Sequence, residues 1–166
     1  MIGNDVWKYG VVKVPEVIEA MLKRAKLKLK DISMIIIHQA NDKMDKDILR
    51  YTFNLLGIKT KRVEKEYYVK RETLVSNLNS EVTKKLLDLY GKLENYSINQ
   101  ISSVFMPMII SWTGNSSVAT CPTVLDLVLK NQIQNCSISK GENVLFVSLG
   151  ASMKINGFIH RFWKDH

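Results

Sequence analysis

The order of apolar and polar residues in the first third of the chain predicts a helix, a buried strand and a second helix. A helix over about 15–26 is indicated by Pro15, which suits a first turn, and by the apolar stripe that follows it. The run Met34-Ile35-Ile36-Ile37 lacks polar alternation, so it predicts a strand that is covered on both faces and central in its sheet. Asn41 or Asp42 is suited to cap the next helix.

The middle of the chain, from about 59 to 102, is more charged. We predict a mostly helical segment that is only half embedded, because it carries a sparse apolar stripe: Val82, Leu86, Leu89 and Leu93. Beyond it we expect a partly extended apolar run over 104–111, a helix capped by Ser116, a buried strand at 144–148 and a last strand reaching Phe162. Uniformly apolar strands alternating with helices predict an α/β layered fold.

Composition narrows the kind of protein. The 166 residues, 46% of them apolar, suit a single globular domain, and no apolar run is long enough to span a membrane. We expect a reduced, cytoplasmic protein, since there is no secretory leader and Cys121 and Cys136 are too few for a disulfide framework or a metal site. A net charge of +8 favours an anionic partner: nucleic acid, a phosphate-bearing coenzyme or an acidic carrier protein. The basic clusters lack a nucleic-acid-binding motif, which disfavours nucleic acid as the partner.

Three polar segments follow predicted strands or precede a predicted helix: His38–Asn41, Trp112–Ser117 and Ser148–Ser152. The carboxyl ends of strands in open α/β sheets are where ligands usually bind, because side chains and helix starts meet there. Taken singly, each segment also fits an ordinary role. The histidine fits a structural residue, the Asn/Ser turn a helix cap, and the glycine loop a tight connection.

Together, and in this order, the motifs His38-Gln39-Ala40-Asn41 and Gly114-Asn115-Ser116-Ser117 resemble the C-terminal half of β-ketoacyl-acyl carrier protein synthase III, a condensing enzyme of the thiolase superfamily. The opening Gly3-Asn4-Asp5-Val6-Trp7-Lys8 matches as well, so the resemblance covers Met1–Leu56 and about 103–163. It implies one half of a thiolase-like α/β fold over residues 1–166. The charged segment 59–102 would be an insertion packed outside the catalytic layers.

The resemblance implies a decarboxylating Claisen condensation. A cysteine takes an acyl group from a coenzyme A thioester, and a malonyl thioester on the phosphopantetheine of acyl carrier protein then attacks it. By motif match, His38 and Asn115 donate hydrogen bonds to the enolate oxygen that forms as carbon dioxide leaves. Two donors on one oxygen should lie within about 4 to 6 Å of each other, at the mouth of one pocket. No permanently bound cofactor and no metal are implied.

The resemblance also implies residues that meet the substrates. Trp7 falls near the mouth of the pantetheine tunnel, while Lys8 and Lys43 fall where basic residues meet the acidic helix of the carrier protein. Asn41 closes the histidine motif and counts with these binding residues. Gly150 belongs to the loop whose backbone shapes the opposite side of the pocket. The residues that would set acyl chain preference lie largely outside this sequence.

The chain departs from the family in three respects. The family's nucleophilic cysteine has no counterpart, because Cys121 and Cys136 lie in the wrong contexts. His38 and Asn115 are 77 positions apart (115 − 38), a much longer interval than in the family. The closing loop carries fewer glycines. We therefore expect a partner, either a Cys-bearing N-terminal half or a second copy, since a lone half would expose a large apolar face. The alternative is a non-catalytic subunit or a truncated remnant of such a synthase.

Overall fold

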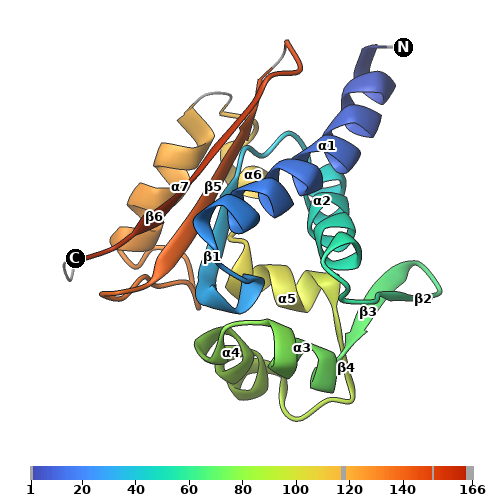
Figure 1. Cartoon of the computed structure of the whole chain (residues 1–166), viewed down its shortest axis with the longest axis vertical. Helices are drawn as coiled ribbons and strands as arrows, with labels where there is room; N and C mark the ends of the chain where they lie inside the picture. Colours follow the sequence, from blue (N-terminus) through green and yellow to red (C-terminus); the bar gives the residue numbers. More distant parts are fainter. Residues whose placement is uncertain (1, 117–118, 151, 164–166) are drawn as a thin grey trace.

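The computed structural model describes residues 2–116, 119–150 and 152–163, and its main feature is a three-stranded sheet (Figure 1). The strands β1 (Ile32–Ile37), β5 (Asn143–Leu149) and β6 (Ile155–Arg161) lie in the order β1-β5-β6. β1 runs parallel to β5, and β6 runs antiparallel to β5. The predicted α/β fold and the three predicted strands are confirmed. β1 is not central, however, because β5 occupies the middle position among the described strands.

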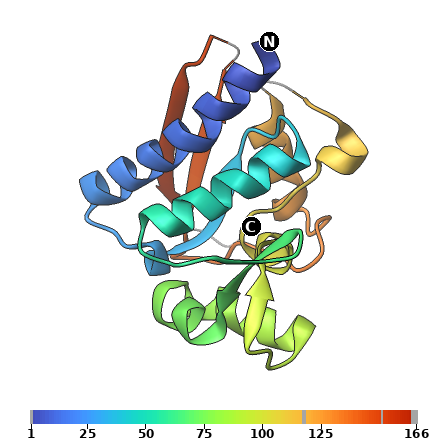
Figure 2. The same cartoon turned by 90° about the vertical axis from the view of Figure 1, so that its right-hand side faces the viewer.

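Helices cover both faces of this sheet. α1 (Ile2–Ala25) and α2 (Asp42–Leu55) pack on one face, and α7 (Thr120–Leu129) packs on the other (Figures 1 and 2). Ile35 and Ile37 of β1 join the core under α1 and α2, whereas Met34 and Ile36 join the core under α7. Every residue of β1 is therefore buried, which is why its sequence shows no polar alternation.

α1 begins well before the predicted start at Pro15, which lies inside the helix. The buried residues Val11, Val14, Ile18 and Leu22 form one stripe that continues across the proline. Packing of this stripe on α2 and the sheet outweighs the hydrogen bond that proline removes. Helices α1 and α2 come close at Gly10, where an added Cβ would collide with the Met44 Cε.

The segment predicted to be mostly helical is mixed. It contains an antiparallel sheet in the order β2-β3-β4, made of Lys61–Val63, Glu66–Lys70 and Asn95–Ser97. Three helices accompany it: α3 (Arg71–Asn77), α4 (Ser80–Tyr90) and α5 (Ile98–Phe105). The segment lies at one end of the main sheet (Figure 1). Its buried residues belong to the same core as those of α1, α2 and β1. That the segment is an insertion outside the catalytic layers stays a prediction.

Two short helices complete the description: a 3-10 turn η1 (Leu29–Asp31) ahead of β1, and α6 (Ile110–Thr113). The apolar run before α6 is not a strand; Met106–Ile109 is irregular and mostly buried. α7 begins at Thr120 with Ala119 at its N-cap position, so Ser116 is not its capping residue. Among the described residues no helix is both long and apolar enough to cross a membrane.

Candidate functional site at the β1–β5 edge

The parallel pairing of β1 and β5 brings two of the predicted site residues to one edge of the sheet. The His38 N–H donates to the Val147 carbonyl at 2.8 Å, which extends the β1–β5 ladder by one residue. Gly150 follows the end of β5 at the same edge. His38 is half-buried and lines, with Leu149, a cavity of about 10 Å³. That is space for about one water molecule.

Gln39 connects this edge to the segment that precedes Asn115. The side chain is 1% exposed. Its Nε2 donates to the Pro107 carbonyl at 2.8 Å, and its Oε1 accepts from the N–H groups of Ile109 at 2.8 Å and Ile110 at 3.0 Å. These three bonds span 68 to 71 positions of sequence. Gln39 belongs to the predicted motif, but no role was predicted for it; a polar residue directly after a buried strand was the available signal.

Asn115 comes soon after this anchored segment. α6 ends at Thr113, and Gly114 adopts a positive φ of 67°, which turns the chain out of the helix. Asn115 is exposed, unlike the half-buried His38. The predicted approach of the two side chains to within hydrogen-bonding reach of one oxygen stays a prediction. Ser117, the last residue of that motif, lies outside the described residues.

Asn41 and Gly150 have local structural roles. The Asn41 Oδ1 accepts from the Met44 N–H at 2.8 Å, so this side chain caps α2. The Gly150 N–H donates to the Lys154 carbonyl at 2.8 Å, inside the turn that joins β5 to β6. An added Cβ at Gly150 would meet the Lys154 carbonyl at 3.6 Å, an ordinary contact. The predicted binding roles of both residues would therefore have to be shared with these local bonds.

Trp7 and Lys43 lie together in a different cavity, at the start of α2. This cavity has a volume of about 530 Å³ and is lined by residues from α1, α2, the β2–β3 hairpin and α5. Besides Trp7 and Lys43 the lining residues include these charged side chains: Asp42, Lys46, Asp47, Arg50, Arg62, Lys65 and Glu66. Lys8 is exposed on α1 next to Trp7 but does not line the cavity. Trp7 and Lys43 come from two of these four elements, α1 and α2, and the hairpin and α5 were not predicted from the sequence.

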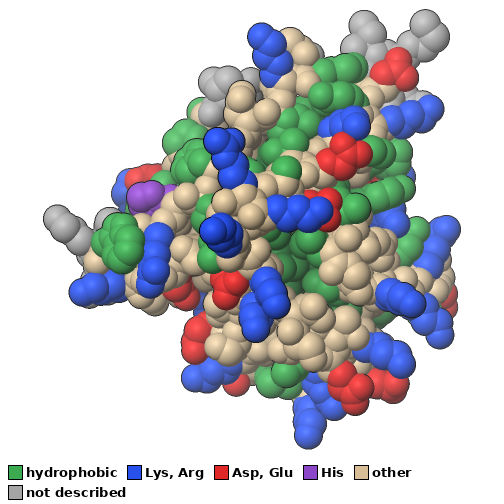
Figure 3. All heavy atoms as spheres, in the orientation of Figure 1, with side chains coloured by type: hydrophobic (Ala, Val, Ile, Leu, Met, Phe, Trp, Pro, Cys, Tyr) green, Lys and Arg blue, Asp and Glu red, His purple; other side chains and the backbone are tan. Residues whose placement is uncertain are grey.

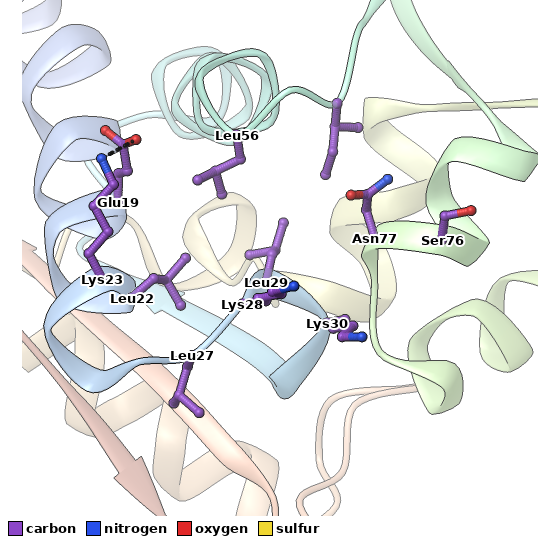
Figure 4. A pocket seen from close by; sticks show the side chains of 11 residues that line it. Glu19, Leu22, Lys23, Leu27, Lys28, Leu29, Lys30, Leu56, Ser76 and Asn77 are labelled. Atoms are coloured by element: carbon purple, nitrogen blue, oxygen red, sulfur yellow. Dashed lines mark ion pairs between the residues drawn. The ribbon is translucent and has the colours of Figure 1, made fainter.

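A further cavity of about 320 Å³ lies near the carboxyl end of α1 (Figure 4). Leucines from α1, η1 and the residues that follow α1 and α2, together with three lysines, surround it. One of these lysines, Lys23, is paired with Glu19 at 2.8 Å. None of the predicted site residues lines this cavity.

Neither cysteine has the environment of a nucleophile. Burial raises the pKa of the Cys121 thiol to about 11, and its Sγ contacts the Val147 carbonyl at 3.6 Å. Burial likewise raises the pKa of Cys136 to about 11, and its Sγ lies 3.5 Å from the Ser103 carbonyl. Because the thiolate is the reactive form, both thiols are unreactive at neutral pH. The described residues also contain no group of three His, Cys, Asp or Glu placed to hold a metal ion.

Asp45 of α2 is the one fully buried carboxyl in the described part of the chain. It is 0% exposed, and neither of its carboxyl oxygens has a hydrogen-bond partner there. Burial raises the pKa of Asp45 to about 8. The side chain is therefore mostly protonated at neutral pH, and no sequence pattern marked it.

Comparison with known proteins supports the motif-based resemblance. No family model matches the chain. β-Ketoacyl-[acyl-carrier-protein] synthase III of Microcystis aeruginosa is 48% identical over 44 residues, which is 26% of this chain and 13% of the relative. The synthase of that name from Acaryochloris marina is 26% identical over 153 residues, 92% of this chain and 31% of the relative.

Solved structures agree at the level of the fold. The 3-oxoacyl-(acyl carrier protein) synthase III of Pseudomonas aeruginosa PAO1 has a TM-score of 0.59 at 17% identity, covering 99% of this chain and 35% of that one. The synthase III of Thermus thermophilus has a TM-score of 0.58 at 20% identity, with the same two coverages of 99% and 35%. This chain thus spans about a third of these structures. The resemblance to these synthases and the thiolase-like α/β fold are confirmed.

Proposed function

We propose that the chain supplies the C-terminal part of a condensing enzyme of the β-ketoacyl-acyl carrier protein synthase III type. In this function His38 and Asn115 stabilise the enolate formed by decarboxylation of a carrier-bound malonyl thioester. The acyl acceptor is a cysteine loaded from a coenzyme A thioester. The observation that carries the proposal is the set of hydrogen bonds made by the buried Gln39 side chain. Gln39 follows His38 directly, and its bonds hold the segment 107–110 that leads to Asn115.

The chemistry needs hydrogen-bond donors at one oxygen. As carbon dioxide leaves, negative charge moves onto the thioester oxygen, and donors that are already oriented stabilise it by about 3 to 4 kcal/mol each. A histidine ring N–H and an asparagine amide are both neutral donors. The Gln39 hydrogen bonds fix the segment that contains His38 relative to the segment that leads to Asn115. Donors held in place in this way need little reorganisation during the reaction, and such donors stabilise the developing charge most effectively.

The nucleophile has to come from outside these 166 residues. Both thiols of the chain are poor nucleophiles because burial raises their pKa. The Cys-bearing part is therefore another segment or another chain, with a cysteine following an apolar strand. A non-catalytic subunit or a remnant is the alternative, and it differs in one respect: His38 and Asn115 would then be dispensable.

The test is reconstitution with a Cys-bearing partner found beside this chain's own coding region, followed by release of labelled carbon dioxide from malonyl-acyl carrier protein. We expect decarboxylation in the complex that falls by about 100-fold with His38→Ala. A complex that forms but releases no carbon dioxide above the partner alone would favour the non-catalytic alternative. Replacing the partner's cysteine by glutamine removes the group that accepts the acyl chain. Any carbon dioxide that this variant releases therefore reports decarboxylation without acyl transfer.

A further inference from the structure

The cavity beside Trp7 and Lys43 has a wall that the sequence resemblance does not account for. That wall is the β2–β3 hairpin, which contributes Arg62, Lys65 and Tyr67. The hairpin projects beside α2 (Figure 1), and basic side chains gather along this side of the molecule (Figure 3).

The acidic side chains of the cavity are already engaged. Each of the three lining carboxylates has a partner: Asp42 pairs with Lys46 at 2.7 Å, Asp47 pairs with Arg50 at 3.1 Å, and Glu66 accepts from Asn99 at 2.8 Å. Lys43, Arg62 and Lys65, by contrast, make no ion pair with any described residue. Three cations without a carboxylate partner therefore surround the cavity, one from α2 and two from the hairpin.

The hairpin cations stand on a fixed support. The Arg50 guanidinium of α2 lies 4.1 Å from the centre of the Tyr67 ring, a cation–π contact, and Val69 of β3 is 0% exposed. The Asn99 bond to Glu66 joins the hairpin to α5. Because α2, α5 and the hairpin are linked in this way, the hairpin backbone loses little conformational freedom when a partner binds.

We propose that the β2–β3 hairpin is a docking element for the acidic helical surface of a carrier protein, with Arg62 and Lys65 acting beside Lys43. This inference rests on the proposed function, which makes a carrier-bound thioester the substrate. A protein surface fits better than a free phosphate ester. The three unpaired cations come from two separate elements, α2 and the hairpin, and this arrangement matches a surface that carries several separate carboxylates.

The experiment measures binding of fluorescently labelled acyl carrier protein, in its apo and holo forms, to the chain by anisotropy at 50 mM salt. Arg62→Glu/Lys65→Glu should weaken binding at least tenfold, and equally for both forms, because the contact is with the protein and not the prosthetic group. The difference should shrink to less than about threefold at 500 mM salt, where charges are strongly screened. Circular dichroism melting checks that the variant remains folded.

The matched control is Lys61→Glu/Lys70→Glu. It makes the same change of net charge at exposed residues of the same hairpin that do not line the cavity. We expect less than a threefold effect. Equal weakening by both double variants would overturn the proposal, because it would show attraction by net charge alone. Weakening of holo but not apo carrier would also overturn it, in favour of a phosphopantetheine site.

Different results would overturn the proposed function and the role of the hairpin. If the unmodified chain, alone and in complex with a Cys-bearing partner, binds neither form of the carrier, then the proposed function fails and takes the inference with it. If the unmodified chain binds the carrier and Lys43→Glu weakens the complex while Arg62→Glu/Lys65→Glu does not, then only the hairpin inference is overturned.

Discussion

Replacing Gln39 tests the connection on which the candidate site depends. Gln39→Ala removes the partners of three backbone groups: the Pro107 carbonyl and the N–H groups of Ile109 and Ile110. Pro107 and Ile109 are buried, so water does not readily replace the lost bonds. A buried polar group left unsatisfied costs about 1 to 3 kcal/mol. We expect a loss of about 3 kcal/mol in the free energy of unfolding, less than the full sum because water enters part of the space left by the side chain.

Urea denaturation measures the loss, and amide hydrogen exchange locates it. The amides of Ile109 and Ile110 should exchange at least tenfold faster than global destabilisation alone explains, because their acceptor is the Gln39 Oε1. Gln39→Glu is the nearly isosteric companion. An ionised carboxylate at position 39 has no proton to donate, so one of its oxygens would face the Pro107 carbonyl oxygen as a second acceptor. Protonation at lower pH restores a donor, so this variant should be more stable at pH 5 than at pH 8.

The control is Gln132→Ala, which truncates an exposed glutamine and should change stability by no more than about 0.5 kcal/mol. An unchanged urea midpoint for Gln39→Ala, with Ile109 and Ile110 still protected, would refute the reasoning. In that case the segment before Asn115 would be held by its apolar packing alone, and the structural link between the two motifs would carry no energy.

Three further predictions concern Asp45, Gly157 and the two motif residues His38 and Asn115. Because Asp45 keeps its proton up to about pH 8 when folded but releases it near its ordinary pKa of 3.8 when unfolded, stability should fall as pH rises from about 4 to 8. Asp45→Asn should therefore stabilise the protein at pH 7, by up to about 4 kcal/mol, and flatten its pH dependence; parallel pH curves from urea titrations would contradict this. Gly157→Ala should destabilise by about 1 to 3 kcal/mol relative to exposed Asn156→Ala in thermal melts, since the new Cβ would lie 2.8 Å from the Phe146 carbonyl. In a reconstituted enzyme, His38→Ala and Asn115→Ala should each slow malonyl decarboxylation by about 100-fold while affecting acyl transfer to the cysteine less; equal losses in both steps would indicate a structural role.

Sequence patterns predicted the elements whose burial is uniform or strictly periodic. β1 was readable because both of its faces are covered, and α2 because one of its faces is buried and a capping Asn41 precedes it. The extension of α1 before Pro15 was not readable, since it depends on packing against α2, which overrides the local cost of proline. The β2–β3 hairpin was missed because most of its residues are exposed and polar, so no alternation marked it.

The candidate site was readable as motifs but not as a geometry. His38 and Asn115 were identifiable by their neighbours in sequence. The bonds of Gln39 join positions about 70 residues apart, and no local pattern contains that information. The cavity shared by Trp7 and Lys43 was likewise predicted only in part, since its charge balance depends on which carboxylates are already paired in the folded chain.

The surroundings of the two motifs explain why a partner is part of the proposed function. His38 borders a cavity of only about 10 Å³, too small for a thioester. On the other side, α6 has no buried residue, and its Trp112 is 59% exposed just before Asn115. An exposed tryptophan beside a candidate catalytic residue is the kind of surface that a second protein body buries. In the proposed function, a pocket large enough for a thioester forms between this edge and the Cys-bearing part, and that part supplies both the nucleophile and the wall that excludes water.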